Sequence, residues 1–244
     1  MNGRWVRETG SAIISALVLL TTLVLTAAAD PGLSAEEIER ERAALLAIMA
    51  QNQAPSSGAD GRIAFPDAAT IGADAAPVLL IEFGDYQCGF CRRHELNVMP
   101  MLARDHVATG RLRYVFMEYP AERNRPISVD AANAALCAHD QGRYSEMRQR
   151  LFANPMSLDN AGYRAHAEAI GLDLSTFTEC LERKPHLDTI QDHVALGQQL
   201  GVRGTPTFFL AMPFGDEGGL QLVRRITGAQ PIDLFERELE SLYP

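Results

Sequence analysis

The amino-acid sequence predicts an α/β fold in which a run of helices interrupts one sheet. Apolar stretches rich in β-branched residues and bounded by Gly or Pro are typical of buried strands, and four are found, at 77–83, 111–118, 207–212 and 220–227. Segments with helical character lie between the second and third strands and after the fourth, at 128–139, 143–152, 160–170, 174–181, 187–200 and 231–242. We therefore expect a sheet built from both ends of this region, with a helical insertion between them.

The remaining expected elements are a strand before 77–83 and a helix between 77–83 and 111–118. Residues 63–71 are expected to contain an irregular first strand. A helix is predicted directly after 77–83, and Pro100 should kink or break it because proline lacks the helical N–H donor. The helix should resume at 101–109, and the strand that follows should lie parallel to 77–83.

Cys88 and Cys91 form a C-x-x-C motif at the first turn of the helix after the strand at 77–83. The free N–H groups and the positive end of the helix dipole favour a thiolate at this position. Cys91 lies one turn further along the helix, within reach of Cys88, so the two residues can close a small disulfide. We expect an exposed, acidified attacking sulfur on Cys88 and a shielded resolving sulfur on Cys91, which suits thiol–disulfide exchange.

The same spacing occurs in half of a zinc site, so the motif alone leaves a metal-binding module open. His94, just past Cys91, is a candidate third ligand for copper or zinc. The sequence offers no fourth nearby ligand and no second C-x-x-C motif, whereas structural zinc sites use four ligands. We expect no metal at the motif, no cofactor, and a solvated position for His94.

A second motif narrows the fold. Thr205 and Pro206 precede an apolar strand, and the stretch Gly-Thr-Pro-Thr-Phe-Phe-Leu resembles the cis-proline loop of the thioredoxin superfamily. With the C-x-x-C motif after a strand, it makes the region from about Pro77 to the C-terminus resemble a DsbA-like thiol:disulfide oxidoreductase. That resemblance implies a thioredoxin fold, divided into a thioredoxin-like domain at 62–126 and 201–244 and an inserted helical domain at 127–200.

Glu82 breaks the apolar strand before the cysteines, although acids are rarely buried. The resemblance implies that Glu82 lies beneath the active site and helps to move the proton of the resolving thiol. The alternative is that strand alternation turns it to solvent. The resemblance also implies a substrate-binding role for Thr205 and Pro206, because a cis X-Pro bond presents the preceding backbone to a bound peptide. The alternative there is an ordinary trans proline.

Cys137 and Cys180 lie on two of the predicted insert helices. Several DsbA-like proteins carry a second, structural disulfide, and the resemblance implies one here. Such a bond would close a long loop, which the chain-entropy treatment values at roughly 4 kcal/mol. The alternative is a pair of inert buried thiols, but disulfides persist in exported proteins.

The N-terminal segment predicts export. Arg4 and Arg7 precede an apolar run at 12–25, and the small residues that follow suit a signal peptidase, so residues 1–29 are interpreted as a signal peptide cleaved before Asp30. If it is not cleaved, the segment is a signal anchor, since its apolar length is near the lower limit of a spanning helix. In both cases the body of the protein is periplasmic or extracytoplasmic.

Residues 30–61 are expected to form a short amphipathic helix and a linker. Ser34 and Glu37 have the spacing of a helix capping box, and Pro, Ser and Gly gather after residue 52. The helix either packs on the body of the protein or frays; the alternative is that it mediates homo-oligomerisation.

Charge and chemistry together bound the partners. The net charge of −9 argues against nucleic acid and anionic membrane surfaces. The expected partners are cysteine-containing exported proteins and a membrane or soluble redox partner. The favoured activity is disulfide oxidase, with isomerase or reductase as the alternative, because Gly89 and Phe90 between the cysteines add no charge to stabilise the thiolate.

Overall fold

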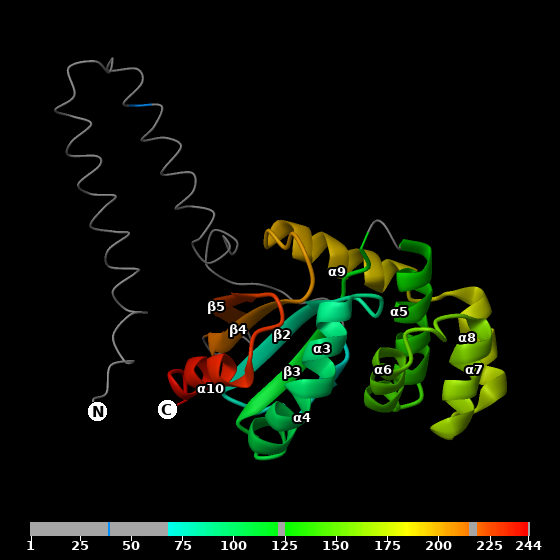
Figure 1. Cartoon of the computed structure of the whole chain (residues 1–244), viewed down its shortest axis with the longest axis horizontal. Helices are drawn as coiled ribbons and strands as arrows, with labels where there is room; N and C mark the ends of the chain where they lie inside the picture. The colour runs from blue at the N-terminus through cyan, green and yellow to red at the C-terminus, as the bar shows by residue number, and fades with distance from the viewer. Residues whose placement is uncertain (1–38, 40–67, 122–124, 215–218, 244) are drawn as a thin grey trace, which may run out of the picture. The chain divides into compact units, whose positions relative to one another are not determined.

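Five strands form one mixed sheet in the part of the chain that the structure describes, in the order β1-β3-β2-β4-β5 (Figure 1). This computed structural model describes residues 39, 68–121, 125–214 and 219–243. The strands are β1 (Thr70–Ile71), β2 (Val78–Gly84), β3 (Leu112–Glu118), β4 (Thr207–Phe214) and β5 (Gly219–Thr227). The central strands β2 and β3 are parallel, while β1 on β3, β4 on β2 and β5 on β4 are antiparallel.

Strand β2 is buried along its whole length, which explains why its sequence is continuously apolar rather than alternating. Val78 and Leu80 point into one hydrophobic core and Leu79, Ile81 and Phe83 into a second core across the sheet. The first core contains side chains of the cysteine helix and of the last helix, and the second contains side chains of the last insert helix. The sheet is therefore the middle of three layers.

Helices and the turns that join them make up most of the rest of the described chain (Figure 1). The cysteine helix α3 (Gly89–Asn97) is followed by α4 (Met99–Leu102) and a π-helical turn (Ala103–Val107). Between β3 and β4 lie α5 (Arg125–His139), α6 (Tyr144–Ala153), α7 (Asn160–Ala169), α8 (Leu174–Arg183) and α9 (Leu187–Gln199), and α10 (Ile232–Glu240) follows β5. The predicted mixed α/β fold is confirmed.

Two local expectations are corrected. The break in the cysteine helix falls at Val98, before Pro100, because proline fits the first turn of the new helix α4, where its missing N–H is not needed. The segment expected to resume as a regular helix at 101–109 instead contains the π-helical turn.

Several predictions concern residues outside the described ranges. These are the signal peptide or signal anchor at 1–29, the helix and linker at 30–61, of which only Glu39 is described, and most of the expected first strand, of which β1 covers only Thr70–Ile71. Within the described residues, no helix combines the length and apolar character that a membrane span requires.

Candidate active site

Cys88 is the N-cap residue of α3. Its backbone is extended, and its Sγ accepts the backbone N–H of Cys91 at 3.2 Å. The thiol can also donate to the backbone oxygen of Thr205, 3.3 Å away. A hydrogen bond from the Cys91 side chain, supported by the Thr205 side chain and backbone N–H groups, lowers the pKa of Cys88 to about 6 despite its burial. The site thus favours a thiolate at Cys88.

Cys91 has the opposite environment. It is fully buried, and burial, its hydrogen bond to Cys88 and the charge of Glu82 raise its pKa far above the ordinary value. The two thiols differ less in solvent exposure than predicted, because Cys88 is itself only 7% exposed. The Thr205 carbonyl packs against its sulfur. The two thiols are therefore distinguished by their pKa values more than by their access to solvent.

We expect the alkylation rate of reduced Cys88 to rise through pH 6, well below the ordinary thiol pKa of about 8.5. A lowered pKa stabilises the reduced fold fully above about pH 8.5, and this contribution is lost as the pH falls through 6. Iodoacetamide trapping across pH, with mass spectrometry to assign the modified residue, measures the midpoint. A midpoint near 8.5, or preferential labelling of Cys91, would contradict this assignment.

Glu82 is buried, with 1% of its surface exposed, so the alternative in which it faces solvent is wrong. Both faces of β2 are covered, and Glu82 lies on the face of Val78 and Leu80, toward α3 and α6. Tyr114 donates a hydrogen bond to Glu82 Oε2 at 2.6 Å. Burial raises the pKa of Glu82 to about 8, opposed by Arg148. Such a carboxyl can hold a proton near neutral pH and release it.

Two charged residues at this site, Arg148 and Glu95, were not predicted from the sequence. Arg148, on α6, is 1% exposed; its Nη2 lies 2.5 Å from Oε2 of Glu95, on α3, and 3.9 Å from Oε2 of Glu82. The guanidinium also lies over the rings of Tyr114, Phe116 and Phe152. The available signal was that Arg148 shares the apolar stripe of its helix with Leu151 and Phe152.

His94 is not the solvated helix residue that was expected. It is fully buried, and its ring packs against Phe208 and Phe235, with centroids 4.5 and 5.1 Å away. Burial, with the charge of Arg148, lowers the pKa of His94 to about 3, so it is a neutral residue of the core. Its Nε2 lies 3.8 Å from Glu82 Oε2.

Thr205 and Pro206 reach the cysteines because β4 pairs with β2. Thr207, the first residue of β4, is opposite Phe83, which places the preceding loop beside Cys88. The Thr205–Pro206 bond is cis, and Phe90 is 59% exposed on the neighbouring helix. A groove of about 330 Å³ runs between α3 and the 229–231 segment.

A second buried carboxyl, Glu118, supports the loop that leads into Cys88. It accepts hydrogen bonds from the hydroxyls of Tyr86 at 3.1 Å and Tyr144 at 3.2 Å, and its backbone N–H donates to His193 Nδ1 at 3.0 Å. Burial raises the pKa of Glu118 to about 8. One acid therefore joins the active-site loop to β3, α6 and α9, a link that no sequence motif indicated.

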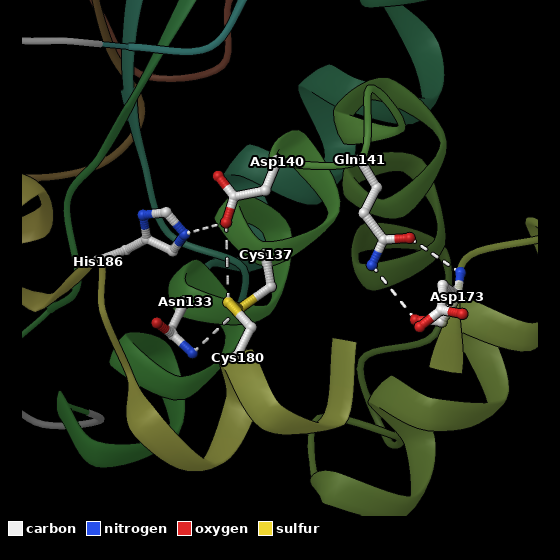
Figure 2. Close-up of a disulfide and its surroundings, with 7 residues drawn as sticks. All are labelled: Asn133, Cys137, Asp140, Gln141, Asp173, Cys180 and His186. Carbon is white, nitrogen blue, oxygen red and sulfur yellow. Dashed lines mark hydrogen bonds and ion pairs between the residues drawn. A yellow bond between two sulfur atoms is a disulfide. The ribbon is translucent and has the colours of Figure 1, made fainter. Parts of the chain in front are cut away.

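Cys137 of α5 and Cys180 of α8 form a disulfide, with an S–S distance of 1.97 Å and a Cα–Cα distance of 5.9 Å (Figure 2). Asn133 Nδ2 lies 3.6 Å from Cys137 Sγ, and His186 Nε2 lies 2.9 Å from Asp140 Oδ2. Among the described residues, the only cluster of three candidate metal ligands consists of these two cysteines and His186. Its sulfurs are bonded to each other and are not free to bind a metal.

Comparisons with known proteins show a resemblance to thioredoxin-like proteins. A family model described as Thioredoxin matches residues 65–212. The Na(+)/H(+) antiporter NhaA 1 of Mycobacterium sp. (strain KMS) is 35% identical over 137 residues, which is 55% of this chain and only 22% of that protein. The probable disulfide bond formation protein D of Bacillus anthracis is 22% identical over 149 residues, covering 58% of this chain and 68% of the relative.

The fold has solved counterparts. The crystal structure of alpha-DsbA1 from Wolbachia pipientis superposes with a TM-score of 0.64 at 23% identity, covering 74% of this chain and 93% of that one. The described residues therefore share the DsbA-type arrangement of a thioredoxin-like sheet and an inserted set of helices. Since the family match also spans more than half of the sequence, this chain belongs to the thioredoxin family.

Proposed function

We propose that this protein catalyses thiol–disulfide exchange on exported protein substrates through Cys88 and Cys91. The observation that carries the proposal is the placement of the two thiols: Cys88 caps the N-terminus of α3, where its Sγ accepts the Cys91 N–H at 3.2 Å, and Cys91 is fully buried. These environments lower the pKa of Cys88 and raise that of Cys91. In a dithiol oxidoreductase, one thiol of low pKa serves as nucleophile and leaving group, and a shielded thiol beside it resolves the mixed disulfide. The name of the Bacillus relative, a disulfide bond formation protein, supports the same activity.

The proposed direction is oxidation of substrate dithiols. A substrate thiolate attacks Cys88 Sγ of the disulfide form, and the electron pair of the broken bond passes to Cys91. The second substrate thiolate then attacks its partner sulfur and displaces Cys88 as a thiolate. A low pKa makes Cys88 a good leaving group and stabilises the reduced enzyme, which is what makes a dithiol couple oxidising.

Three further residues have proposed roles in this cycle. Glu82 exchanges a proton with Cys91, for which its burial and raised pKa are suited. The backbone oxygen of Thr205 accepts a hydrogen bond from the Cys88 thiol, and the backbone of Thr205 and Pro206 is the proposed contact for a substrate peptide beside Cys88. The location is extracytoplasmic, with a separate redox partner that restores the disulfide.

The direction can be tested by the reduction potential of the Cys88–Cys91 couple. We expect a value between about −270 mV, that of thioredoxin, and about −120 mV, that of DsbA, because Gly89 and Phe90 add no charge near the thiolate. Phe90→His should raise the potential, since His⁺ favours a neighbouring thiolate. Equilibration of the full chain in glutathione buffers measures both values.

The matched control is Phe90→Gln, which removes the exposed ring and its contact with Arg93 without adding a cation. Its potential should stay close to that of the wild type. A wild-type potential at the DsbA extreme, or equal shifts for Phe90→His and Phe90→Gln, would contradict the argument. A potential at or below that of thioredoxin would instead favour the reductase alternative.

A further inference from the structure

Arg148 is a buried cation that faces two acids at very different distances. Its Nη2 is 2.5 Å from Glu95 Oε2 and 3.9 Å from Glu82 Oε2, and all three side chains are at most 5% exposed. In a site that excludes water, the closer acid takes most of the Coulomb stabilisation. Glu95 is therefore the ion-pair partner of Arg148, and the electrostatic attraction between Arg148 and Glu82 is weaker.

Tyr114 separates Arg148 from Glu82. Arg148 Nη2 donates to the Tyr114 hydroxyl at 2.6 Å, and that hydroxyl donates to Glu82 Oε2 at 2.6 Å. Glu82 thus receives a neutral donor in place of the cation, while its Oε1 has no hydrogen-bond partner among the described residues. That free oxygen is where a carboxylic acid proton can reside.

The other groups that face Glu82 do not supply a cation. His94 of α3 lies 3.8 Å away, but burial keeps this histidine neutral. The Cys88 thiolate adds a negative charge that opposes ionisation of Glu82. From the neighbouring strand β4, Phe208 is the paired residue and carries no charge. The protonation of Glu82 therefore depends on how far Glu95 neutralises the positive charge of Arg148.

We propose that Glu95 competes with Glu82 for Arg148, and that this competition keeps Glu82 protonated as the proton donor for Cys91. Arg148 and Glu95 are then positioning residues, and the inserted helices, through Arg148, set the proton supply of the resolving thiol. This inference rests on the proposed exchange reaction at Cys88 and Cys91.

The proton balance of the step is simple. When substrate thiolate attacks Cys88 Sγ, the Cys88–Cys91 bond breaks and its electron pair goes to Cys91 Sγ. Cys91 takes the proton of Glu82, which becomes a carboxylate held by Tyr114 and, more distantly, by Arg148. On reoxidation Glu82 takes the proton back as Cys91 attacks the mixed disulfide at Cys88.

The test uses two variants with opposite expected signs. Glu95→Gln keeps the side-chain size but frees Arg148, so the titration midpoint of Glu82 should fall by about one pH unit or more. Arg148→Met removes the cation, so the midpoint should rise. Arg148→Lys keeps the charge and should stay near the wild type. The readout is the infrared carbonyl band of the protonated acid in the reduced full chain, assigned by its loss in Glu82→Gln.

A merely structural role would not move the midpoint in opposite directions. An unchanged midpoint in Glu95→Gln, or shifts of the same sign in both variants, would overturn the proposal. If Arg148→Met does not fold, Glu95→Gln and Arg148→Lys still decide, because only the former should acidify Glu82. Opposite shifts in a protein without exchange activity would refute the proposed function and, with it, the role of Glu82 as proton donor, and would leave only the control of Glu82 protonation by Glu95 and Arg148. Full exchange activity without shifts would overturn this inference and leave the proposed function standing.

Discussion

Replacement of Cys88 by serine should abolish exchange, while replacement of Cys91 by serine should let mixed disulfides with substrate accumulate. Cys88 carries the lowered pKa and the hydrogen bonds that stabilise a thiolate, so no other described thiol can take its place. Without Cys91, the Cys88 thiolate still attacks a substrate disulfide, but the resolving thiol is missing. Non-reducing electrophoresis after reaction with a disulfide-containing exported protein measures both outcomes.

The control for this experiment is the loss of a cysteine elsewhere. Cys137→Ser with Cys180→Ser removes two sulfurs that lie on α5 and α8, and exchange at Cys88 should persist. Full activity of Cys88→Ser together with an absence of mixed disulfide in Cys91→Ser would show that the roles assigned to the two cysteines are wrong.

The same double serine variant should lower the free energy of unfolding by about 4 kcal/mol. Cys137 and Cys180 are 43 residues apart, and a cross-link over such a loop stabilises mainly by restricting the unfolded chain. Denaturant unfolding of the oxidised wild type and the variant measures the difference. Mass spectrometry of the non-reduced protein should find the two residues linked to each other.

A shift well below 1 kcal/mol would contradict this prediction, as would free thiols at both positions in exported material. The single variant Cys180→Ser gives a further comparison, because it also leaves Cys137 as a buried free thiol. It should be destabilised by at least a similar amount, since the constraint on the loop is lost in both variants.

The sequence was most informative at motifs that occur in few structural settings. The spacing of Cys88 and Cys91 after a strand, and the Thr205–Pro206 pair before another, were enough to predict the thioredoxin-like fold. Glu82 could be singled out because a charge in an apolar strand is rare. Each of these signals lies within a few consecutive residues, so it can be recognised from the sequence alone.

The rest of the site depends on contacts between distant segments. Arg148 and Glu95 look like ordinary charged helix residues until α6 is packed on α3, and Tyr86, Tyr144 and Glu118 meet only when three elements come together. His94 was misassigned for the same reason, since its burial is due to Phe208 and Phe235. The spacing of residues along a helix does not by itself indicate which other segments pack against each of its faces.

The contact between Cys88 and Thr205 has a consequence for biogenesis. The two residues are 117 positions apart, and the whole insert lies between them, so the contact forms only after a long loop has closed. A growing chain contains Cys88 before Thr205 has been synthesised. During that interval the Cys88 thiol has not yet made its contact with Thr205 and reacts more like an ordinary cysteine. Full reactivity is therefore one of the last properties that the newly made protein acquires.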